Sequence, residues 1–296
     1  MIYRVRHLTA YSYDTPVASA TLALRVTPRD GAAQRTLRHK LEVSPQPVSV
    51  EFERDFYGNA VNVVTIEDPH TELSIHATAE VEVTYGAAPP GPGRNWEEVA
   101  DAAMQSHDMS SEAPAHFMFA SPRIQLSSEV TRYARESFAS GRGVIEASRD
   151  LMRRIKREFD YRPQSTEIGT PLQQAFAARR GVCQDFAHIM IAGLRGLGVP
   201  AAYVSRYLRT VPPPGKERLE GADATHAWVS VWCGPQTGWL GFDPTNALDT
   251  GNDHIALAIG RDFSDVSPVY GVFVGSGANE LRVEVDVVPL PRDQAA

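Results

Sequence analysis

Hydrophobic and polar residues alternate with a period of two over most of the segment from Ile2 to Tyr85. The alternation is clear from Tyr3 to Thr9, from Leu22 to Val26 and around Val81, and groups of Pro, Gly, Asn and Asp separate these runs. Alternation of this kind predicts strands that bury one face, and the turn residues between them favour antiparallel pairing. We therefore expect a β-sandwich of about six strands.

A run of Gly, Ala and Pro follows, from Gly86 to Gly93, and it predicts a linker because this composition suits neither a sheet nor a helix. Beyond it, apolar residues recur at a spacing of about 3.6 from Val144 to Phe159 and from Phe186 to Leu197, which indicates helices. Strand-like segments return after Pro200, interrupted by a predicted surface loop between Val211 and Lys216.

These segments define the predicted organisation of the chain. Helices followed by an antiparallel sheet are typical of the α+β class. We expect residues 1–86 to form an N-terminal β-sandwich, residues 87–95 to link it, and residues 96–296 to form a second, α+β domain that carries the chemistry.

Composition and charge exclude several classes of protein. The 296 residues carry 29 Lys and Arg against 36 Asp and Glu, a net charge of −7, and no uninterrupted basic run is longer than two residues. A nucleic-acid partner therefore lacks its usual electrostatic footprint. No stretch approaches the ~20 apolar residues of a membrane span, and Met1–His7 lacks the apolar core of a signal peptide, so we expect a cytoplasmic protein without a membrane partner.

Two cysteines, Cys183 and Cys233, are too few to hold a chain of this length by disulfides. Cys183 follows Gly181 and opens the second helical segment. The positive end of a helix dipole and its free N–H groups favour a thiolate there and stabilise a developing oxyanion, as a nucleophile requires. The alternative is an inert thiol in the core, which is the commoner state of a free cysteine.

A partner base for such a thiol lies in the strand-like segment Thr225–Trp232, where His226 is near the start. The segment Trp239–Asp243 is interpreted as the returning strand of a hairpin, because turn residues separate the two. A turn centred just after Gly234 places His226 directly opposite Asp243, close enough for the carboxylate to orient the imidazole. Taken singly, His226 also suits a core histidine and Asp243 a strand-end carboxylate.

Three segments resemble the catalytic blocks of the transglutaminase-like superfamily, and each contains one of these residues. They are Gly181–Ala187, Asp223–Val229 and Gly238–Asn246. Further segments resemble the microbial branch of these papain-like thiol enzymes, which carries an N-terminal β domain. These are His7–Tyr13, Leu24–Arg29 and His254–Asp262. Gly198–Ala201, which follows the first catalytic block, resembles the superfamily as well.

The resemblance implies that Cys183 is the nucleophile, that His226 is the base and then the acid, and that Asp243 orients His226. It also implies a transglutaminase-like core in which the central helix delivers Cys183 to the sheet bearing the other two. Gln184 and Asp185 follow the cysteine where the animal enzymes have a tryptophan, and the sequence has no calcium loop. Calcium activation is therefore not implied.

Five further residues are candidates for substrate binding. A second oxyanion donor, beside the backbone N–H of the nucleophile, is expected from Gln164 or Gln173, each of which otherwise suits an exposed position. Trp228 and Trp239 are expected to line the cleft, although strand tryptophans commonly pack in a core, and His254 either borders the pocket or lies in a loop. The sequence has no zinc-type spacing and no phosphate loop, so we expect no metal and no cofactor.

The expected function is that of a thiol acyl-transfer enzyme, a cysteine peptidase or amidohydrolase that cleaves a peptide-like amide through a thioester. Its expected partner is a peptide or protein amide substrate. Two alternatives stay open. A protein-glutamine gamma-glutamyltransferase uses the same residues with an amine as acceptor, and a non-catalytic module uses the cleft to bind a peptide or protein. The sequence sets no expectation for the oligomeric state.

Overall fold

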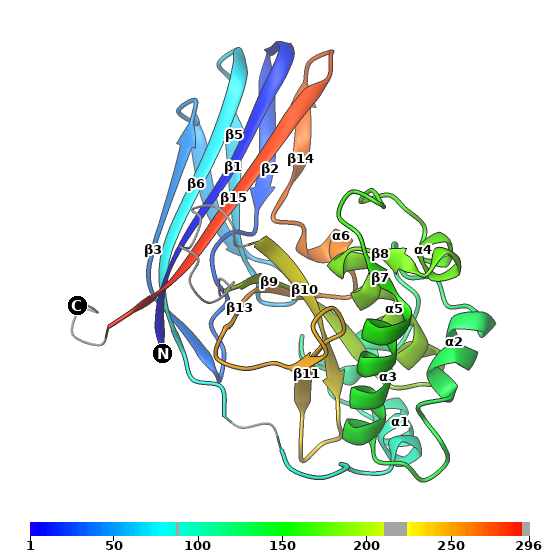
Figure 1. Ribbon diagram of the computed structural model, residues 1–296. Coiled ribbons are helices and arrows are strands. Elements are labelled where there is room, and N and C mark those ends of the chain that lie inside the picture. The colour runs from blue at the N-terminus through cyan, green and yellow to red at the C-terminus, as the bar shows by residue number, and fades with distance from the viewer. Residues whose placement is uncertain (87–88, 210–223, 292–296) are drawn as a thin grey trace, which may run out of the picture.

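The computed structural model describes residues 1–86, 89–209 and 224–291. Long strands form a β-sandwich, and an α+β part lies beside it (Figure 1). The α+β class predicted from the sequence is confirmed. The predicted loop between Val211 and Lys216 lies outside the described residues, as do residues 87 and 88 of the predicted linker.

The sandwich consists of two four-stranded antiparallel sheets. The first contains, in spatial order, β15 (Asn279–Leu290), β1 (Ile2–Val17), β6 (His70–Val83) and β3 (Gln34–Ser44). The second contains β14 (Val269–Val274), β2 (Ser19–Leu24), β5 (Ala60–Ile66) and β4 (Ser49–Arg54). Leu24, Ile66 and Ile75 are buried between the sheets, as the alternating pattern predicts.

The sandwich contains strands from both ends of the chain, which differs from the predicted division at residue 86. β14 and β15 each form the edge of one sheet, with Gly271 paired to Leu22 and Val283 paired to Thr9. These two strands therefore lie outside the α+β part to which we had assigned them. Local alternation identifies a strand but not its partner, because pairing over more than 260 residues depends on contacts across the whole fold.

The α+β part is built on a five-stranded antiparallel sheet. In spatial order its strands are β12 (Leu248–Asp249), β11 (Trp239–Asp243), β10 (Ala224–Trp232), β9 (Ala201–Leu208) and β13 (His254–Gly260). Helix α5 (Cys183–Gly196) packs against β9 and β10. Its buried side chains, Met190 and Leu194 among them, share one apolar core with Val229 and Val231 of β10.

Helices α2, α3 and α4 pack against α5, whereas α6 packs against β9 and β13 of the central sheet (Figure 1). The longer helices apart from α5 are α1 (Trp96–Met104), α2 (Ser128–Arg135) and α3 (Val144–Glu158). The shorter elements are the 3-10 helix η1 (Pro114–Phe117), α4 (Leu172–Ala178), α6 (Phe263–Val266), and the parallel pair β7 (Asp160–Tyr161) and β8 (Arg180–Gly181).

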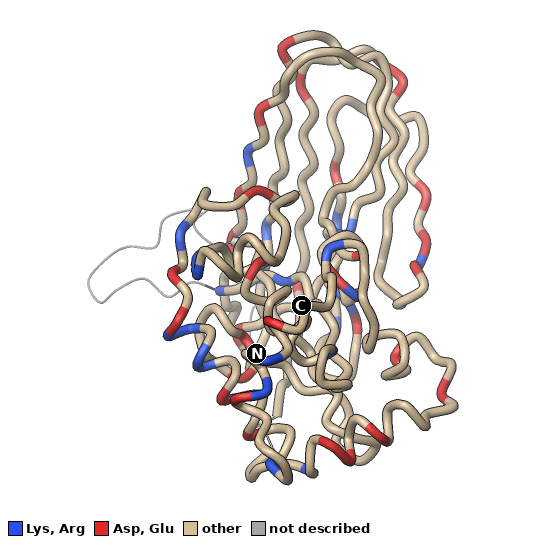
Figure 2. Tube along the Cα trace, turned by 90° about the vertical axis from the view of Figure 1, so that its right-hand side faces the viewer, with Lys and Arg blue, Asp and Glu red and all other residues tan. Residues whose placement is uncertain are grey.

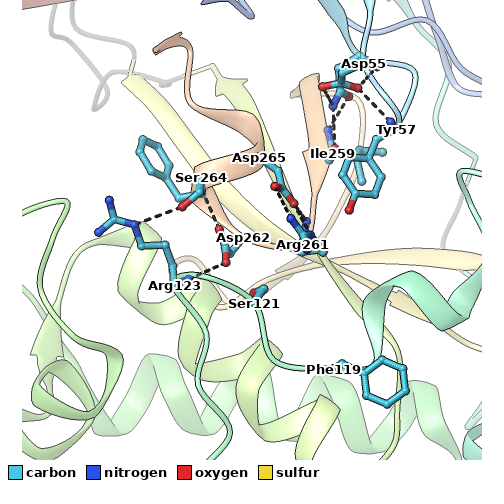
Figure 3. A network of polar contacts seen from close by, with 12 residues as sticks. Asp55, Tyr57, Phe119, Ser121, Arg123, Ile259, Arg261, Asp262, Ser264 and Asp265 are labelled. Carbon is cyan, nitrogen blue, oxygen red and sulfur yellow. Dashed lines mark hydrogen bonds and ion pairs between the residues drawn. The ribbon is translucent and has the colours of Figure 1, made fainter. Parts of the chain in front are cut away.

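Two side-chain amides fasten the sandwich to β13, an edge strand of the central sheet. Gln34 donates from Nε2 to the carbonyl of Ala256 and accepts the N–H of the same residue, each at 2.8 Å. Asn59 makes the same pair of bonds with Ile259, each at 2.8 Å, and Asp55 accepts the N–H of Asn59 at 3.0 Å (Figure 3). Each amide thus satisfies backbone groups that the edge of the sheet leaves free.

Asp262 fixes the connection between β13 and β14. Its buried carboxylate accepts the backbone N–H groups of Arg123 and Ser264, each at 2.8 Å (Figure 3). Arg123 precedes α2 and Ser264 lies in α6, so this carboxylate joins the helical layer to the segment that leads back into the sandwich. Arg261, the preceding residue, donates from Nε to Asp265 of α6 at 2.9 Å, so the same connection has a second polar contact.

Basic and acidic residues are interspersed along the described chain, without a segment dominated by Lys and Arg (Figure 2). Among the helices that the structure describes, none combines the length and the apolar character needed to cross a membrane.

Candidate active site

The start of α5 fixes the position of Cys183. The carboxylate of Asp185 accepts the N–H of Val182 at 2.8 Å and the hydroxyl of Thr166 at 2.6 Å. The bond to Val182 caps the helix by satisfying a backbone donor at its first turn. Gly181 is required beside this cap, because a Cβ there would lie 2.6 Å from Asp185 Oδ2. These contacts hold the cysteine at the helix N-terminus, as the sequence predicts.

Strands β10 and β11 bring His226 and Asp243 together, but in a register that differs from the predicted one. Val229 pairs with Phe242, which places Asp243 opposite Trp228, two residues away from His226. The turn is centred one residue further along the chain than we predicted, so direct opposition was wrong. A shift of two residues keeps both side chains on one face. His226 Nε2 consequently lies 3.2 Å from Asp243 Oδ2.

The carboxylate of Asp243 is fully buried and surrounded by donors. Oδ1 accepts the N–H of Thr245 at 2.9 Å and the N–H of Asn246 at 3.1 Å, and Oδ2 accepts the side-chain amide of Asn246 at 2.8 Å. Burial alone raises the pKa of Asp243, but the hydrogen bond from His226 and the charge of Arg206 outweigh it and hold that pKa well below its usual range. Asp243 is therefore a carboxylate at neutral pH.

Arg206 is part of the site, and the sequence analysis missed it. It lies in β9 directly opposite His226, its side chain is fully buried, and it forms an ion pair with Asp243 Oδ2. The ring of Trp228 lies 4.9 Å from the centre of the guanidinium. Burial lowers the pKa of Arg206 to about 10, so the group remains charged at neutral pH. The available signal was a single arginine within the otherwise apolar and hydroxylic strand Ala201–Leu208.

The thiol of Cys183 is neutral in this state, which corrects the expectation of a thiolate at the helix start. Burial raises its pKa to about 11, although hydrogen bonds from the backbone of Ala227 and Gln184 and the charge of Arg206 act in the opposite direction. Burial also lowers the pKa of His226 below its ordinary value. At neutral pH the site therefore contains a neutral thiol and a neutral imidazole.

Cys183 and His226 line one cavity of about 300 Å³. The α+β part contributes further polar groups to it, among them Gln184, whose amide donates to the carbonyl of Ile168 at 3.4 Å. The opposite wall comes from β1 and β15 of the sandwich, including Thr9 and Val283. The cavity thus lies between the two parts of the molecule.

The remaining candidates lie elsewhere. Gln164 and Gln173 are exposed, and neither lines the catalytic cavity, so the structure does not bring them to the position of an oxyanion donor. Trp228 and Trp239 line a different cavity, of about 480 Å³. His254 is buried, and its ring packs edge-on against Trp228 with centroids 5.5 Å apart.

A cysteine at the start of a central helix, packed on an antiparallel sheet that bears a hydrogen-bonded histidine and aspartate, defines the transglutaminase-like class of fold. The sequence matches two family models, the bacterial transglutaminase-like N-terminal region over residues 3–82 and the transglutaminase-like superfamily over residues 131–244. The chain belongs to the transglutaminase-like superfamily.

Comparisons with individual proteins agree with this assignment. An uncharacterized protein of Mycobacterium tuberculosis is 40% identical over 98% of this chain and 94% of its own length. A crystal structure described as a “Putative Cysteine Protease”, from Cytophaga hutchinsonii, shares the fold with a TM-score of 0.76, at 23% identity over 98% of this chain and 92% of that chain. A protein-glutamine gamma-glutamyltransferase of Pseudomonas aeruginosa is 31% identical over 38% of this chain and 17% of its own length.

Proposed function

We propose that the protein is a cysteine-dependent amidohydrolase that cleaves a peptide-like amide through a thioester on Cys183. The observation that carries this proposal is the cavity that Cys183 and His226 both line, with Asp243 Oδ2 lying 3.2 Å from Nε2 of the imidazole. Membership in the transglutaminase-like superfamily supports thiol chemistry at this position.

The geometry supports a general-base mechanism. Because Nε2 of His226 donates to Asp243, the other ring nitrogen, Nδ1, is left to take the proton of the Cys183 thiol. The sulfur then attacks the carbonyl carbon, and the backbone N–H of Cys183 at the helix start stabilises the oxyanion. The imidazolium returns its proton to the nitrogen of the leaving amine as the C–N bond breaks.

Hydrolysis completes the cycle by the same proton path in reverse. The acyl group remains on the sulfur as a thioester until water attacks its carbonyl carbon. His226 accepts a proton from that water, and the C–S bond breaks as the proton passes to the sulfur. Asp243 stays ionised throughout and stabilises the imidazolium that forms in each half of the cycle.

The test uses the full-length protein with a library of fluorogenic peptide amides. We expect cleavage that Cys183→Ala abolishes and Cys233→Ala preserves, because Cys233 is fully buried in the core and lies outside the cavity. Mass spectrometry of the intact protein after rapid acid quenching should detect the acyl group, and peptide mapping should locate it on Cys183. Equal cleavage by the Cys183→Ala variant would contradict the mechanism.

Transfer to an amine is the second candidate, and the similarity to a gamma-glutamyltransferase over 38% of the chain favours testing it. The same acylated cysteine serves both reactions, so the acceptor decides between them. A labelled primary amine added to the assay measures the ratio of amide product to free acid. Amine incorporation that exceeds release of acid would replace hydrolysis by transfer. Binding of peptides without any acyl-enzyme would favour the non-catalytic module.

A further inference from the structure

We propose that the sandwich wall of the catalytic cavity, formed by β1 and β15, selects substrates whose acyl side carries an uncharged, apolar side chain. This inference rests on the proposed function, because the selected side chain belongs to the amide that Cys183 attacks. It assigns to the sandwich a direct role in recognition.

One face of the first sandwich sheet makes both the junction with the α+β part and the cavity wall. Tyr3 and Val5 of β1 pack in an apolar cluster with Tyr207 and Ile255 of the central sheet. The following residues on the same face, beginning with His7, line the cavity. Residues two apart on a strand share a face, so Tyr3, Val5 and His7 all lie on the same side of the sheet.

The strand at the edge of this sheet extends the wall. Val283 is paired with Thr9, and Leu281 is paired with Tyr11, and all four residues line the cavity. Val283 is 44% exposed and Leu281 is 48% exposed, so both offer apolar surface that a ligand would cover.

The cavity is lined without Asp, Glu, Lys or Arg among the residues that the structure describes. Its apolar surface comes from both parts of the molecule, because Ile168 and Phe263 line it together with the sandwich residues. A charged group buried here would lose its hydration without gaining a counter-ion, whereas an apolar side chain would gain from leaving water. The volume of about 300 Å³ lies at the small end of ligand pockets.

The histidine in this wall does not alter its neutrality. One ring nitrogen of His7 lies 2.7 Å from the Tyr207 hydroxyl and the other 3.0 Å from the Thr9 hydroxyl. Burial lowers the pKa of His7 to about 4, so the ring is uncharged at neutral pH. Since both nitrogens have partners within the protein, His7 is not a second base for the reaction.

The test compares two thiol reagents of similar length, N-butylmaleimide and the anionic maleimidobutyrate, as probes of access to Cys183. Rates are measured at neutral pH by mass spectrometry of the Cys183 peptide and divided by the rates with glutathione, which removes intrinsic reactivity. We expect the neutral reagent to react about tenfold faster than the anion after this correction, because the wall offers the carboxylate no counter-ion.

An acidic and a basic substitution in the wall should change the ratio of the two corrected rates in opposite directions. Val283→Asp should lower the relative rate of maleimidobutyrate further, and Val283→Lys should raise it. The matched controls are Val288→Asp and Val288→Lys. Val288 lies on the same strand with a similar exposure of 40%, but on the other face and outside the cavity, so these variants should leave the ratio unchanged.

The outcomes separate this inference from the proposed function. Equal corrected rates for the two reagents in the native protein, or equal responses at positions 283 and 288, would overturn the role of the wall. The amide library is then used with norleucine, lysine or glutamate on the acyl side. A preference for the neutral reagent without any amide cleavage would support selection by the wall and contradict the amidohydrolase function. Cleavage at equal rates for all three side chains would support the amidohydrolase function and contradict selection by the wall.

Discussion

Arg206 and Asp243 form an ion pair in which both side chains are fully buried, and His226 reaches the same carboxylate oxygen at 3.2 Å. The carboxylate is therefore bound at once by a permanent cation and by the imidazole that it orients. Arg206 keeps Asp243 ionised, which allows Asp243 to accept the Nε2–H of His226 and leaves Nδ1 of that ring unprotonated. Arg206 is thus a positioning residue that acts through Asp243.

Arg206→Met should reduce both stability and activity. Removing the cation leaves a buried carboxylate without its permanently charged partner, and breaking a buried pair in this way destabilises proteins by about 3–5 kcal/mol. The pKa of Asp243 should rise, and the loss of kcat/KM should grow as the pH falls. Urea unfolding gives the first quantity and a pH profile of kcat/KM the second. Stability unchanged from the native protein would contradict the pairing.

The double variant Arg206→Met, Asp243→Asn separates structure from chemistry. Replacing both partners removes the unpaired charge, so we expect most of the lost stability to return. Activity should not return, because an asparagine does not stabilise the imidazolium, and we expect a decrease in kcat of about 10³-fold or more. Recovery of kcat in parallel with stability would show that the pair has only a structural role.

The pH dependence of Cys183 should reflect a neutral resting thiol. Since burial raises its pKa to about 11, alkylation by iodoacetamide should increase steadily from neutral to alkaline pH without a plateau. Since burial lowers the pKa of His226, the acid limb of kcat/KM should lie below 6.5. A plateau in the alkylation rate near neutral pH, lost in His226→Ala, would instead reveal a preformed thiolate and imidazolium.

Stability should decrease as the pH falls from 6.5 to about 4. Burial lowers the pKa of both His7 and His188 to about 4, so the unfolded chain binds protons in this interval that the native protein does not. Each group then contributes up to about 3 kcal/mol to the decrease. Urea unfolding across this range measures it, and His7→Gln should reduce the slope. Stability independent of pH in this interval would contradict the burial of neutral rings.

Gly181→Ala should impair the start of α5. The added Cβ would lie 2.6 Å from Asp185 Oδ2, so the cap must move and Cys183 with it. We expect a loss of about 1–3 kcal/mol in stability and a larger proportional loss of kcat than of substrate affinity. Gly31→Ala is the matched control, because nothing lies within 4 Å of a Cβ there. Similar effects of both substitutions would argue against the cap.

The sequence predicts the parts of the site that depend on local pattern. A helix beginning at Cys183 and a hairpin bearing His226 and Asp243 follow from apolar spacing and turn residues. The observed register differs from the predicted one by two residues, and an even shift leaves both side chains on the same face. The local sequence pattern does not predict how segments that are distant in the sequence pack against one another. The pairing of Arg206 with Asp243 and the cavity wall at Thr9 and Val283 both depend on such packing.

The substrate-binding residues show the same limit. Trp228 and Trp239 are aromatic residues close in sequence to His226 and Asp243, which made them candidates for the cleft, but the structure places them in another cavity. Trp228 shares a face with His226, so alternation alone does not exclude it from the site. Cys183 lies near the backbone of Ala227, and the catalytic cavity includes Thr225 and His226 of β10 but not Trp228, so position along the strand excludes Trp228 from the site.

The return of β14 and β15 to the two sheets of the sandwich has a consequence for the nascent chain. When residues 1–86 have left the ribosome, β1 still lacks its neighbour β15, and β2 lacks β14, so both sheets present unpaired backbone along one border. Neither sheet is complete until the residues of β14 and β15 have been synthesised. A proteolytic cut between residues 89 and 95 would accordingly leave the two fragments bound to each other, since strands of each fragment are hydrogen-bonded to strands of the other.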